Sequence, residues 1–245
     1  MKDVIAVIPA RSGSKSVPHK NITDLNGYPM LAYSIAVARI AGIERVLLSA
    51  DCSDYMKIGQ QYGAETPFVR PPEYSTDKSS DFDFMNHAMN WVYENERQIP
   101  EYWVHLRPTT PLRDPSVIND ALEKIKSDMN STSLRSGHLA TESPLKWFMK
   151  DNNDYFKPLL NNLSAQDTNL PRQHFDDVYI PNGYVDIIRA SFAMNNKQKC
   201  IHGSKMIVFE TEKVDEIDSI DELELIKFKS KNYNSKIFDY LKSHK

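Results

Sequence analysis

Near its amino terminus the chain reads Val4-Ile5-Ala6-Val7-Ile8-Pro9-Ala10-Arg11-Ser12-Gly13-Ser14-Lys15. The first five residues form an uninterrupted apolar run rich in β-branched side chains, which is typical of a strand buried on both faces of a sheet. The rest of the stretch is a polar loop with basic side chains and no acidic ones. Ligands of open α/β sheets bind beyond the carboxyl ends of the strands, so this loop is the first candidate for a site.

The alternation of strand and helix continues downstream. Apolar runs predict strands over residues 45–50, 66–69 and 102–106, and helical spacing predicts helices over 29–41, 54–62, 81–97 and 115–129. After Ser131 the rhythm weakens, with strands predicted over 132–134, 178–188 and 205–209 and helices over 219–230 and 232–242. This order favours an α/β fold with a doubly wound, mostly parallel, Rossmann-like sheet that carries helices on both faces.

The length of 245 residues fits one domain over 1–245, large enough to bury a sizeable core. Residues 141–172 do not fit a strand–helix unit, because they are polar and contain Pro144, Pro158 and Pro171. We interpret this segment as an excursion from the core and a candidate dimerisation arm.

The composition excludes several classes of protein. A net charge of −3 argues against bulk binding to nucleic acid. The apolar runs are too short to span a membrane, and Lys2 and Asp3 lead into a strand-like run rather than a signal peptide. The two cysteines, Cys52 and Cys200, support neither a disulfide framework nor a zinc site, which favours the reduced cytoplasm.

The loop after the first predicted strand suits a polyphosphate. It carries Arg11, Lys15 and Lys20, while Gly13 and its neighbouring serines allow backbone N–H groups to turn toward an anion. It is not a P-loop, and the chain has no G-x-G-x-x-G, which disfavours a dinucleotide-dependent oxidoreductase. A solvated basic loop without a ligand is the alternative.

An acidic segment near the carboxyl end complements this loop in charge. Residues 4–23 carry a net charge of +3, whereas residues 210–224 carry −7. Within the acidic segment, Glu216 and Asp218 are two residues apart, so on extended backbone their carboxylates point the same way and suit Mg²⁺ beside phosphates. The alternative is an acidic approach to a helix capped by Asp218 or Ser219.

Two further segments have both a functional and a structural interpretation. The run Arg107-Pro108-Thr109-Thr110-Pro111 follows a predicted strand and places a cation and two hydroxyls at the ligand edge, or forms a turn before a helix capped by Asp114. The pair Asn182-Gly183, flanked by strand-like residues, is also typical of a hairpin turn or a bulge.

Several of these segments together resemble the CMP-sialic acid synthetases, which are the acylneuraminate cytidylyltransferases among the sugar nucleotidyltransferases. The resemblance covers roughly residues 4–225, and its motifs are specific. They are Ile8-Pro9-Ala10-Arg11-Ser12-Gly13-Ser14-Lys15 with Pro18 and Lys20-Asn21, Ser49-Ala50-Asp51, Arg70-Pro71 with residues 77–80, Leu106-Arg107-Pro108-Thr109-Thr110-Pro111-Leu112-Arg113, Ser143-Pro144-Leu145-Lys146, Arg172-Gln173, Tyr179 with Asn182-Gly183, and Glu216-Ile217-Asp218.

The resemblance implies transfer of CMP from CTP to the anomeric hydroxyl of an α-keto sugar acid, with release of pyrophosphate, in a Mg²⁺-dependent homodimer. The implied catalytic residues are Arg11, Lys15 and Lys20, and the implied metal ligands are Glu216 and Asp218. The implied nucleotide-binding residues are Ala10, Ser12, Gly13, Asn21, Arg70 and Ser79. The implied acceptor-binding residues are Arg107, Thr109, Thr110, Lys146, Arg172, Gln173, Tyr179 and Asn182.

Three of the positions at which the chain departs from the family pattern bear on the loop, the metal site and the acceptor. Ser16 stands where the family usually has Gly, and Glu216 where it usually has Asp. Arg107 replaces the usual Gln, and a guanidinium lacks the acceptor of an amide, which points to an acceptor other than N-acetylneuraminic acid, of the legionaminic type. An N-acetylneuraminate or 3-deoxy-octulosonate enzyme and a non-catalytic nucleotide-binding relative are the alternatives.

Overall fold

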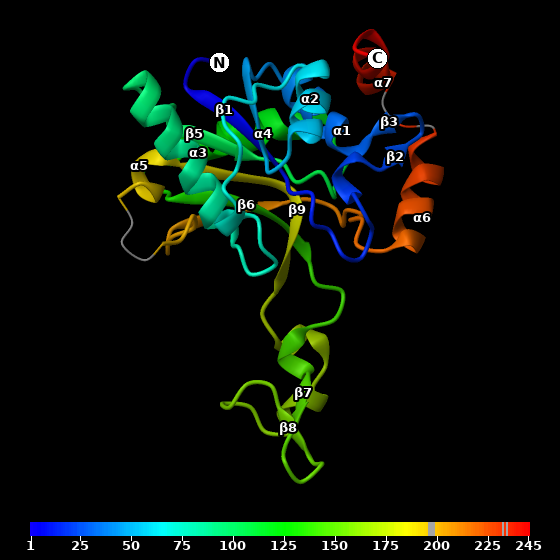
Figure 1. Cartoon of the computed structure of the whole chain (residues 1–245). Coiled ribbons are helices and arrows are strands. Elements are labelled where there is room, and N and C mark those ends of the chain that lie inside the picture. The colour runs from blue at the N-terminus through cyan, green and yellow to red at the C-terminus, as the bar shows by residue number, and fades with distance from the viewer. Residues whose placement is uncertain (196–198, 232, 234) are drawn as a thin grey trace.

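A central sheet with the strand order β10-β6-β9-β5-β1-β4 lies at the middle of the molecule (Figure 1). The computed structural model describes residues 1–245 except 196–198, 232 and 234. The bounds of these strands are Val4–Ala10 for β1, Arg45–Ala50 for β4, Tyr102–His105 for β5, Ser133–Leu139 for β6, Tyr179–Arg189 for β9 and Met206–Glu210 for β10. The α/β class predicted from the sequence is confirmed.

One strand runs against the others. β1 pairs in parallel with β4 and β5, and β10 with β6, whereas β9 is antiparallel to both β5 and β6. The sheet is therefore mostly parallel, as predicted. Because β6 runs outward and β9 returns beside it, the segment between them leaves the sheet at its carboxyl edge.

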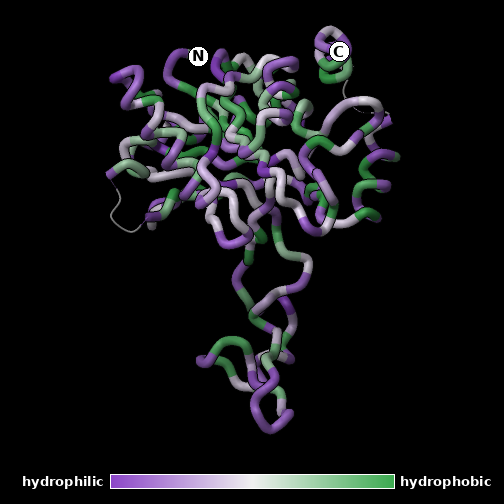
Figure 2. Tube along the Cα trace, viewed as in Figure 1, coloured by the Kyte–Doolittle hydropathy of each residue, from purple (hydrophilic) through white to green (hydrophobic). Residues whose placement is uncertain are grey.

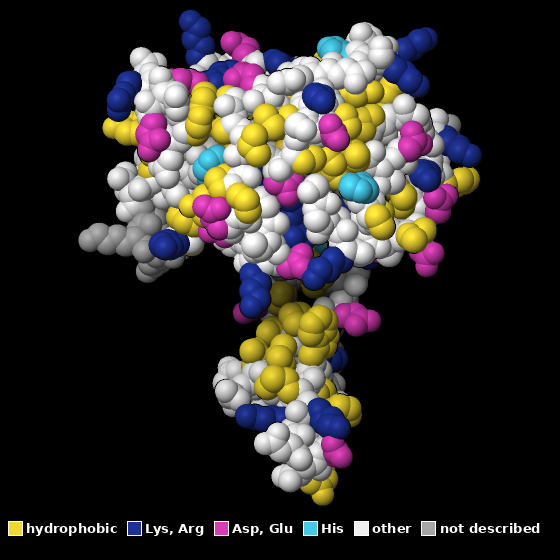
Figure 3. Space-filling view, viewed as in Figure 1, with side chains coloured by type: hydrophobic (Ala, Val, Ile, Leu, Met, Phe, Trp, Pro, Cys, Tyr) yellow, Lys and Arg dark blue, Asp and Glu magenta, His cyan; other side chains and the backbone are white. Residues whose placement is uncertain are grey.

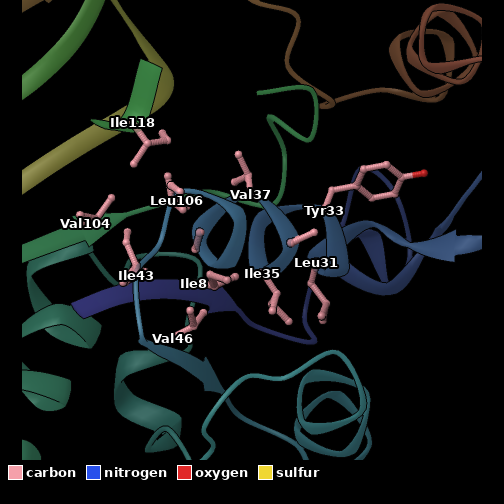
Figure 4. Close-up of a cluster of buried hydrophobic side chains, with 14 of the residues drawn as sticks. Ile8, Leu31, Tyr33, Ile35, Val37, Ile43, Val46, Val104, Leu106 and Ile118 are labelled. Carbon is pink, nitrogen blue, oxygen red and sulfur yellow. The ribbon is translucent and has the colours of Figure 1, made fainter. Parts of the chain in front are cut away.

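Helices cover both faces of the sheet. The bounds are Met30–Ile40 for α1, Ser53–Gln61 for α2, Asp81–Glu96 for α3, Pro115–Ser127 for α4, Ala190–Ala193 for α5, Ile220–Ser230 for α6 and Ser235–Ser243 for α7. One apolar cluster joins α1, α4, α6 and α7 to one face, and a second joins α3 and α5 to the other. Figure 4 shows part of the first cluster, in which Ile8, Val46 and Val104 come from neighbouring strands.

The first strand is buried on both faces, as its apolar run indicated. Ala6 and Ile8 belong to the first cluster, whereas Ile5 and Val7 belong to the second. Alternate side chains of a strand point to opposite faces, so a strand between two helical layers needs apolar residues at every position.

Most predicted elements are confirmed within a few residues, but the strand over 66–69 is wrong. The chain there makes only one bridge, between Glu65 and Leu47, and hydrogen bonds next to it from Glu65 and Arg70 to the backbone of β4. Pro67 has no N–H, which interrupts the ladder. The last predicted helix begins at Ser235 as α7; residues 232 and 234 lie outside the described residues.

A small hairpin inside the first loop was not predicted. β2 (Asp24–Leu25) and β3 (Tyr28–Pro29) pair around Asn26 and Gly27, which have φ values of 52° and 91°. Asn-Gly is the typical sequence of such a two-residue turn, because both positions need positive φ.

The segment between β6 and β9, residues 140–178, projects from the body and is called the arm here (Figure 1). It contains the antiparallel pair β7 (Phe148–Lys150) and β8 (Phe156–Pro158) and the short 3₁₀ turns η3 (Pro144–Lys146), η4 (Asp167–Asn169) and η5 (Arg172–His174). Figure 2 shows that the arm carries apolar as well as polar stretches.

Among the described helices, none is long and apolar enough to cross a membrane.

Candidate active site

A cleft of about 470 Å³ lies at the carboxyl edge of the sheet. It is lined by the loop after β1, by the segment that leads from Arg70 into α3, and by the loop after β5. Eight of the residues predicted from the sequence line it: Arg11, Lys15, Lys20, Asn21, Arg70, Ser79, Arg107 and Thr109. In Figure 3, basic and acidic side chains meet on the body just above the start of the arm.

The loop after β1 is held in shape by polar contacts at its two ends. The backbone N–H of Ser12 donates to Asp51 Oδ1 at 2.8 Å, and Asn21 Nδ2 donates to the carbonyl of Arg11 at 2.9 Å. Ala10 is buried at the end of β1, and an added Cβ at Gly13 would have nothing within 4 Å. These contacts leave the basic side chains of the loop at the cleft.

Each of the three loop cations has a carboxylate partner. Arg11 donates to Asp77 Oδ1 at 2.8 Å, and Lys15 pairs with the other oxygen of Asp77. These two cations, Lys15 first, hold the pKa of Asp77 below its usual value. Lys20 pairs with Asp218 at 2.8 Å, across 198 positions of sequence. The cationic loop and the acidic segment thus meet at one place.

Arg70 lies under the cleft rather than in its opening. Its Nε donates to Ser49 Oγ at 3.0 Å, and its guanidinium stacks over Phe84 at 5.0 Å from the ring centroid. Burial lowers the pKa of Arg70 to about 10, so the side chain stays charged at neutral pH. Ser79 closes the loop above it by donating to the carbonyl of Glu73 at 3.0 Å.

Arg107 is held between two carboxylates. It donates to Asp186 at 2.9 Å and to Asp81 at 2.6 Å. Burial alone would lower the pKa of Arg107, but the two carboxylates outweigh burial and raise it. The charge of Arg107 is therefore largely neutralised within the protein. This disfavours a role for Arg107 in binding the carboxylate of an acceptor. Thr109 lines the cleft, and Thr110 is buried behind it.

The two carboxylates predicted as metal ligands differ in surroundings. Asp218 is exposed next to Lys20, whereas Glu216 is half-buried and accepts the N–H of Gly183 at 2.6 Å through Oε1. Across the described part of the chain, no three His, Cys, Asp or Glu side chains gather as a metal site. Two hard oxygen donors beside a phosphate site nevertheless fit Mg²⁺, which takes one or two carboxylates with phosphates and waters.

The remaining predicted residues lie on the arm or in β9, outside the lining of the cleft. Lys146 donates to the carbonyl of Leu170 at 2.9 Å, and Arg172 donates to that of Ala140 at 3.0 Å. Both line a hollow at the base of the arm, and Gln173 lines a second one beside Arg172. Tyr179 donates to Glu210 at 3.1 Å, and Asn182 to Thr211 at 2.9 Å.

A family model described as cytidylyltransferase matches residues 5–221 of this sequence. The chain belongs to the cytidylyltransferase family. It is 30% identical over 153 residues to the pseudaminic acid cytidylyltransferase of Campylobacter jejuni, covering 62% of this chain and 66% of that protein. It is 33% identical over 124 residues to the CMP-N,N'-diacetyllegionaminic acid synthase of Legionella pneumophila, covering 49% and 52%.

A third relative shares a shorter part of its length with this cytidylyltransferase. The N-acylneuraminate cytidylyltransferase of Escherichia coli is 40% identical over 121 residues, which are 49% of this chain and 27% of that protein. The chain spans just under two thirds, or less, of these three relatives.

Solved structures agree on the fold. A CMP:2-keto-3-deoxy-manno-octonic acid synthetase complexed with CTP superposes with a TM-score of 0.67 at 17% identity, over 93% of this chain and 98% of its own. A cytidylyltransferase from Leptospira borgpetersenii gives 0.61 at 14% identity, over 98% and 93%.

A buried polar cluster under the cleft was not predicted from the sequence. Asp186 is fully buried in β9 and lies 3.8 Å from His105 and 3.9 Å from His202, in addition to its bond with Arg107. Burial, followed by the charge of Arg107, holds the pKa of His105 well below its usual value, so that this histidine is neutral. The available signal was an acid inside the otherwise apolar run 185–188.

Proposed function

We propose that this chain transfers CMP from CTP to the anomeric hydroxyl of a nonulosonic acid and releases pyrophosphate. The observation that carries the proposal is the ion pair of Lys20 with Asp218, which brings the acidic segment next to a cation that lines the cleft. Membership of the cytidylyltransferase family supports it, as do relatives named for pseudaminic, legionaminic and N-acylneuraminic acids.

The residues of the cleft suit displacement at phosphorus, which depends on positioning and charge neutralisation. Arg11, Lys15 and Lys20 bind the triphosphate and stabilise charge on the leaving pyrophosphate. The backbone around Ala10, Ser12 and Gly13, with Asn21, Arg70 and Ser79, holds the nucleotide. Asp218 and Glu216 would hold Mg²⁺, which supplies a Lewis acid that lowers the pKa of a hydroxyl.

The acceptor is proposed to be of the legionaminic type. Asp81 and Asp186 hold Arg107 in place and neutralise its charge. Its remaining N–H groups would therefore donate to neutral oxygens of the acceptor rather than pair with the acceptor carboxylate. Thr109, Thr110, Tyr179 and Asn182 complete this side of the acceptor site. The acceptor carboxylate is left to Lys146, Arg172 and Gln173.

Those last three residues lie on the arm, and we propose that they serve the cleft of a second copy of the chain in a homodimer. The arm exposes apolar side chains, with Tyr155 72% and Phe156 80% accessible. Figure 3 shows hydrophobic side chains gathered on the part of the arm nearest the body. A second copy would cover them. We place the enzyme in the cytoplasm, with no nucleic-acid or membrane partner.

The experiment is pyrophosphate release from CTP, measured with and without Mg²⁺ across a panel of sugar acids. Legionaminic acids are expected to give the highest kcat/KM. Best turnover with N-acetylneuraminic, pseudaminic or 3-deoxy-octulosonic acid would reject the proposed acceptor but keep the reaction. Absence of pyrophosphate release with every acid, while CTP still binds, would support a non-catalytic relative instead.

A further inference from the structure

Arg113 is fully buried and has no carboxylate partner among the described residues. All five of its N–H groups donate to uncharged acceptors, namely Ser34 Oγ at 3.2 Å and the carbonyls of Arg107 at 2.8 Å, Gly183 at 2.7 Å, Thr110 and Tyr184. Burial lowers its pKa to about 9, so it remains protonated at neutral pH. A guanidinium is the side chain that can supply five donors in one plane.

These acceptors belong to separate elements. Arg107 and Thr110 lie in the loop after β5, Gly183 and Tyr184 lie in β9, and Ser34 lies in α1. At this point β9 has a register shift against β6, between the pairs of Arg135 and Gly137, so its carbonyls are turned out of the regular ladder. Arg113 therefore fixes the loop and the irregular part of β9 relative to each other.

The acidic segment docks onto the two elements that Arg113 joins. Glu216 accepts the N–H of Gly183 at 2.6 Å, and the N–H of Ile217 donates to the carbonyl of Thr109 at 2.8 Å. A Cβ at position 183 would lie 2.6 Å from Thr110 Oγ1 and 2.8 Å from Glu216 Oε1. The fit is close enough that a shift of β9 or of the loop moves Glu216.

We propose that Arg113 is a positioning residue for nucleotidyl transfer: it sets the loop after β5 and the irregular part of β9 so that the segment 216–218 lies against the cationic loop. This role rests on the proposed function and extends it to a residue that does not touch the cleft. Arg113 acts through Glu216 and through Asp218, the partner of Lys20.

The test compares Arg113→Lys with Arg189→Lys. Arg189 is the control, because it is also buried and donates to backbone carbonyls, those of Ile125 and Asp128, at the opposite end of β9. Unlike Arg113, it also pairs with a carboxylate, that of Glu101, at 3.3 Å. Arg113→Lys is expected to lower kcat by about 100-fold, the effect of a small misplacement of reacting groups, with little change in the Kd of CTP. Arg189→Lys is expected to lower the melting temperature but not kcat.

A second readout does not depend on turnover. Lys20 is shielded, with 13% of its side chain exposed, whereas Lys57 is 75% exposed and serves as the internal reference. Acetylation followed by mass spectrometry is expected to label Lys20 several-fold faster in Arg113→Lys than in wild type or Arg189→Lys. Gly183→Ala, which keeps the guanidinium but displaces Glu216, is expected to match Arg113→Lys in both readouts, and it replaces that variant if the latter does not fold.

Equal loss of kcat in Arg113→Lys and Arg189→Lys, or unchanged labelling of Lys20, would overturn the positioning role. If wild type releases no pyrophosphate with any acid, the proposed function fails. The labelling comparison then still decides whether Arg113 positions the acidic segment.

Discussion

Lys20 differs from the other two loop cations in its surroundings. Its side chain is 13% exposed, compared with 35% for Arg11 and 83% for Lys15. A charge in a partly buried position interacts more strongly with nearby charges, because the surrounding dielectric constant is lower. Lys20 should therefore contribute more to the stabilisation of phosphate charge than Lys15 does.

Lys20→Ala is expected to lower kcat by about 10³-fold, which is typical for the loss of one preorganised charge-stabilising group. Asp218→Ala is expected to reduce kcat to a comparable extent. Steady-state pyrophosphate release measures both, and circular dichroism checks the fold. Lys229→Ala is the control, because its ion pair with Asp215, at 2.6 Å, involves neither the loop after β1 nor Asp218. Near-normal turnover of either cleft variant would remove that residue from the mechanism.

Asp77 competes with the triphosphate for two cations. Both of its oxygens are engaged, one by Arg11 and the other by Lys15. Asp77→Asn is therefore expected to tighten CTP binding by up to about fivefold, because it removes competing ion pairs that are exposed and therefore weak. Isothermal titration calorimetry measures the Kd. Asp54→Asn, which breaks the exposed pair with Lys57, should leave it unchanged. Weaker CTP binding by Asp77→Asn would show that Asp77 assists the nucleotide instead.

At the scale of elements, the run from Arg107 to Asp114 has two roles, because it lines the cleft and also caps α4. Asp114 caps the helix by accepting the N–H of Ser116 at 2.9 Å, while the residues before it form the loop at the cleft. Asp114→Ala is expected to lower the free energy of unfolding by about 1 kcal/mol, the usual value of an N-cap, without a change in kcat. Urea unfolding measures this, with the exposed Asp120→Ala as control; equal stability of both variants would contradict the cap.

The elements that could be predicted from the sequence are those with strong local signals. The apolar run at residues 4–8 predicted a buried strand, and the spacing of apolar residues in α1 and α4 predicted the helices that pack on the sheet. The basic loop predicted the position of the cleft. The cluster around Asp186 could not be predicted, because it is assembled from β5, β6, β9 and the segment after α5, which only the fold brings together. The carboxylates that neutralise the charge of Arg107 belong to α3 and β9, so this neutralisation could not be predicted from the sequence either.

At the scale of the whole molecule, the cleft of one chain lacks the arm residues that we propose for binding the acceptor. Lys146 and Arg172 are at the base of the arm and bond to its own backbone there, outside the lining of the cleft. Obligate dimers bury large apolar surfaces, and the exposed aromatic side chains of the arm fit that pattern.

Phe156→Asp is expected to shift the protein from dimer to monomer, because Phe156 is 80% accessible and a charge there would oppose apolar contact. Light scattering coupled to size exclusion measures the mass, and KM for the sugar acid is expected to rise while the Kd of CTP stays constant. Tyr93→Asp, at an exposed position on α3, is the control. A wild-type monomer, or a dimeric Phe156→Asp variant, would contradict a dimer built through the arm.

The ion pair between Lys20 and Asp218 also has a consequence for biosynthesis. Its two residues are 198 positions apart, so the basic loop leaves the ribosome long before its acidic partner is made. Until then Lys20 lacks its partner Asp218, whereas Arg11 and Lys15 can already pair with Asp77. Under the proposed function, a translation product that terminates before Glu216 is therefore expected to release no pyrophosphate from CTP, even though it contains the whole basic loop.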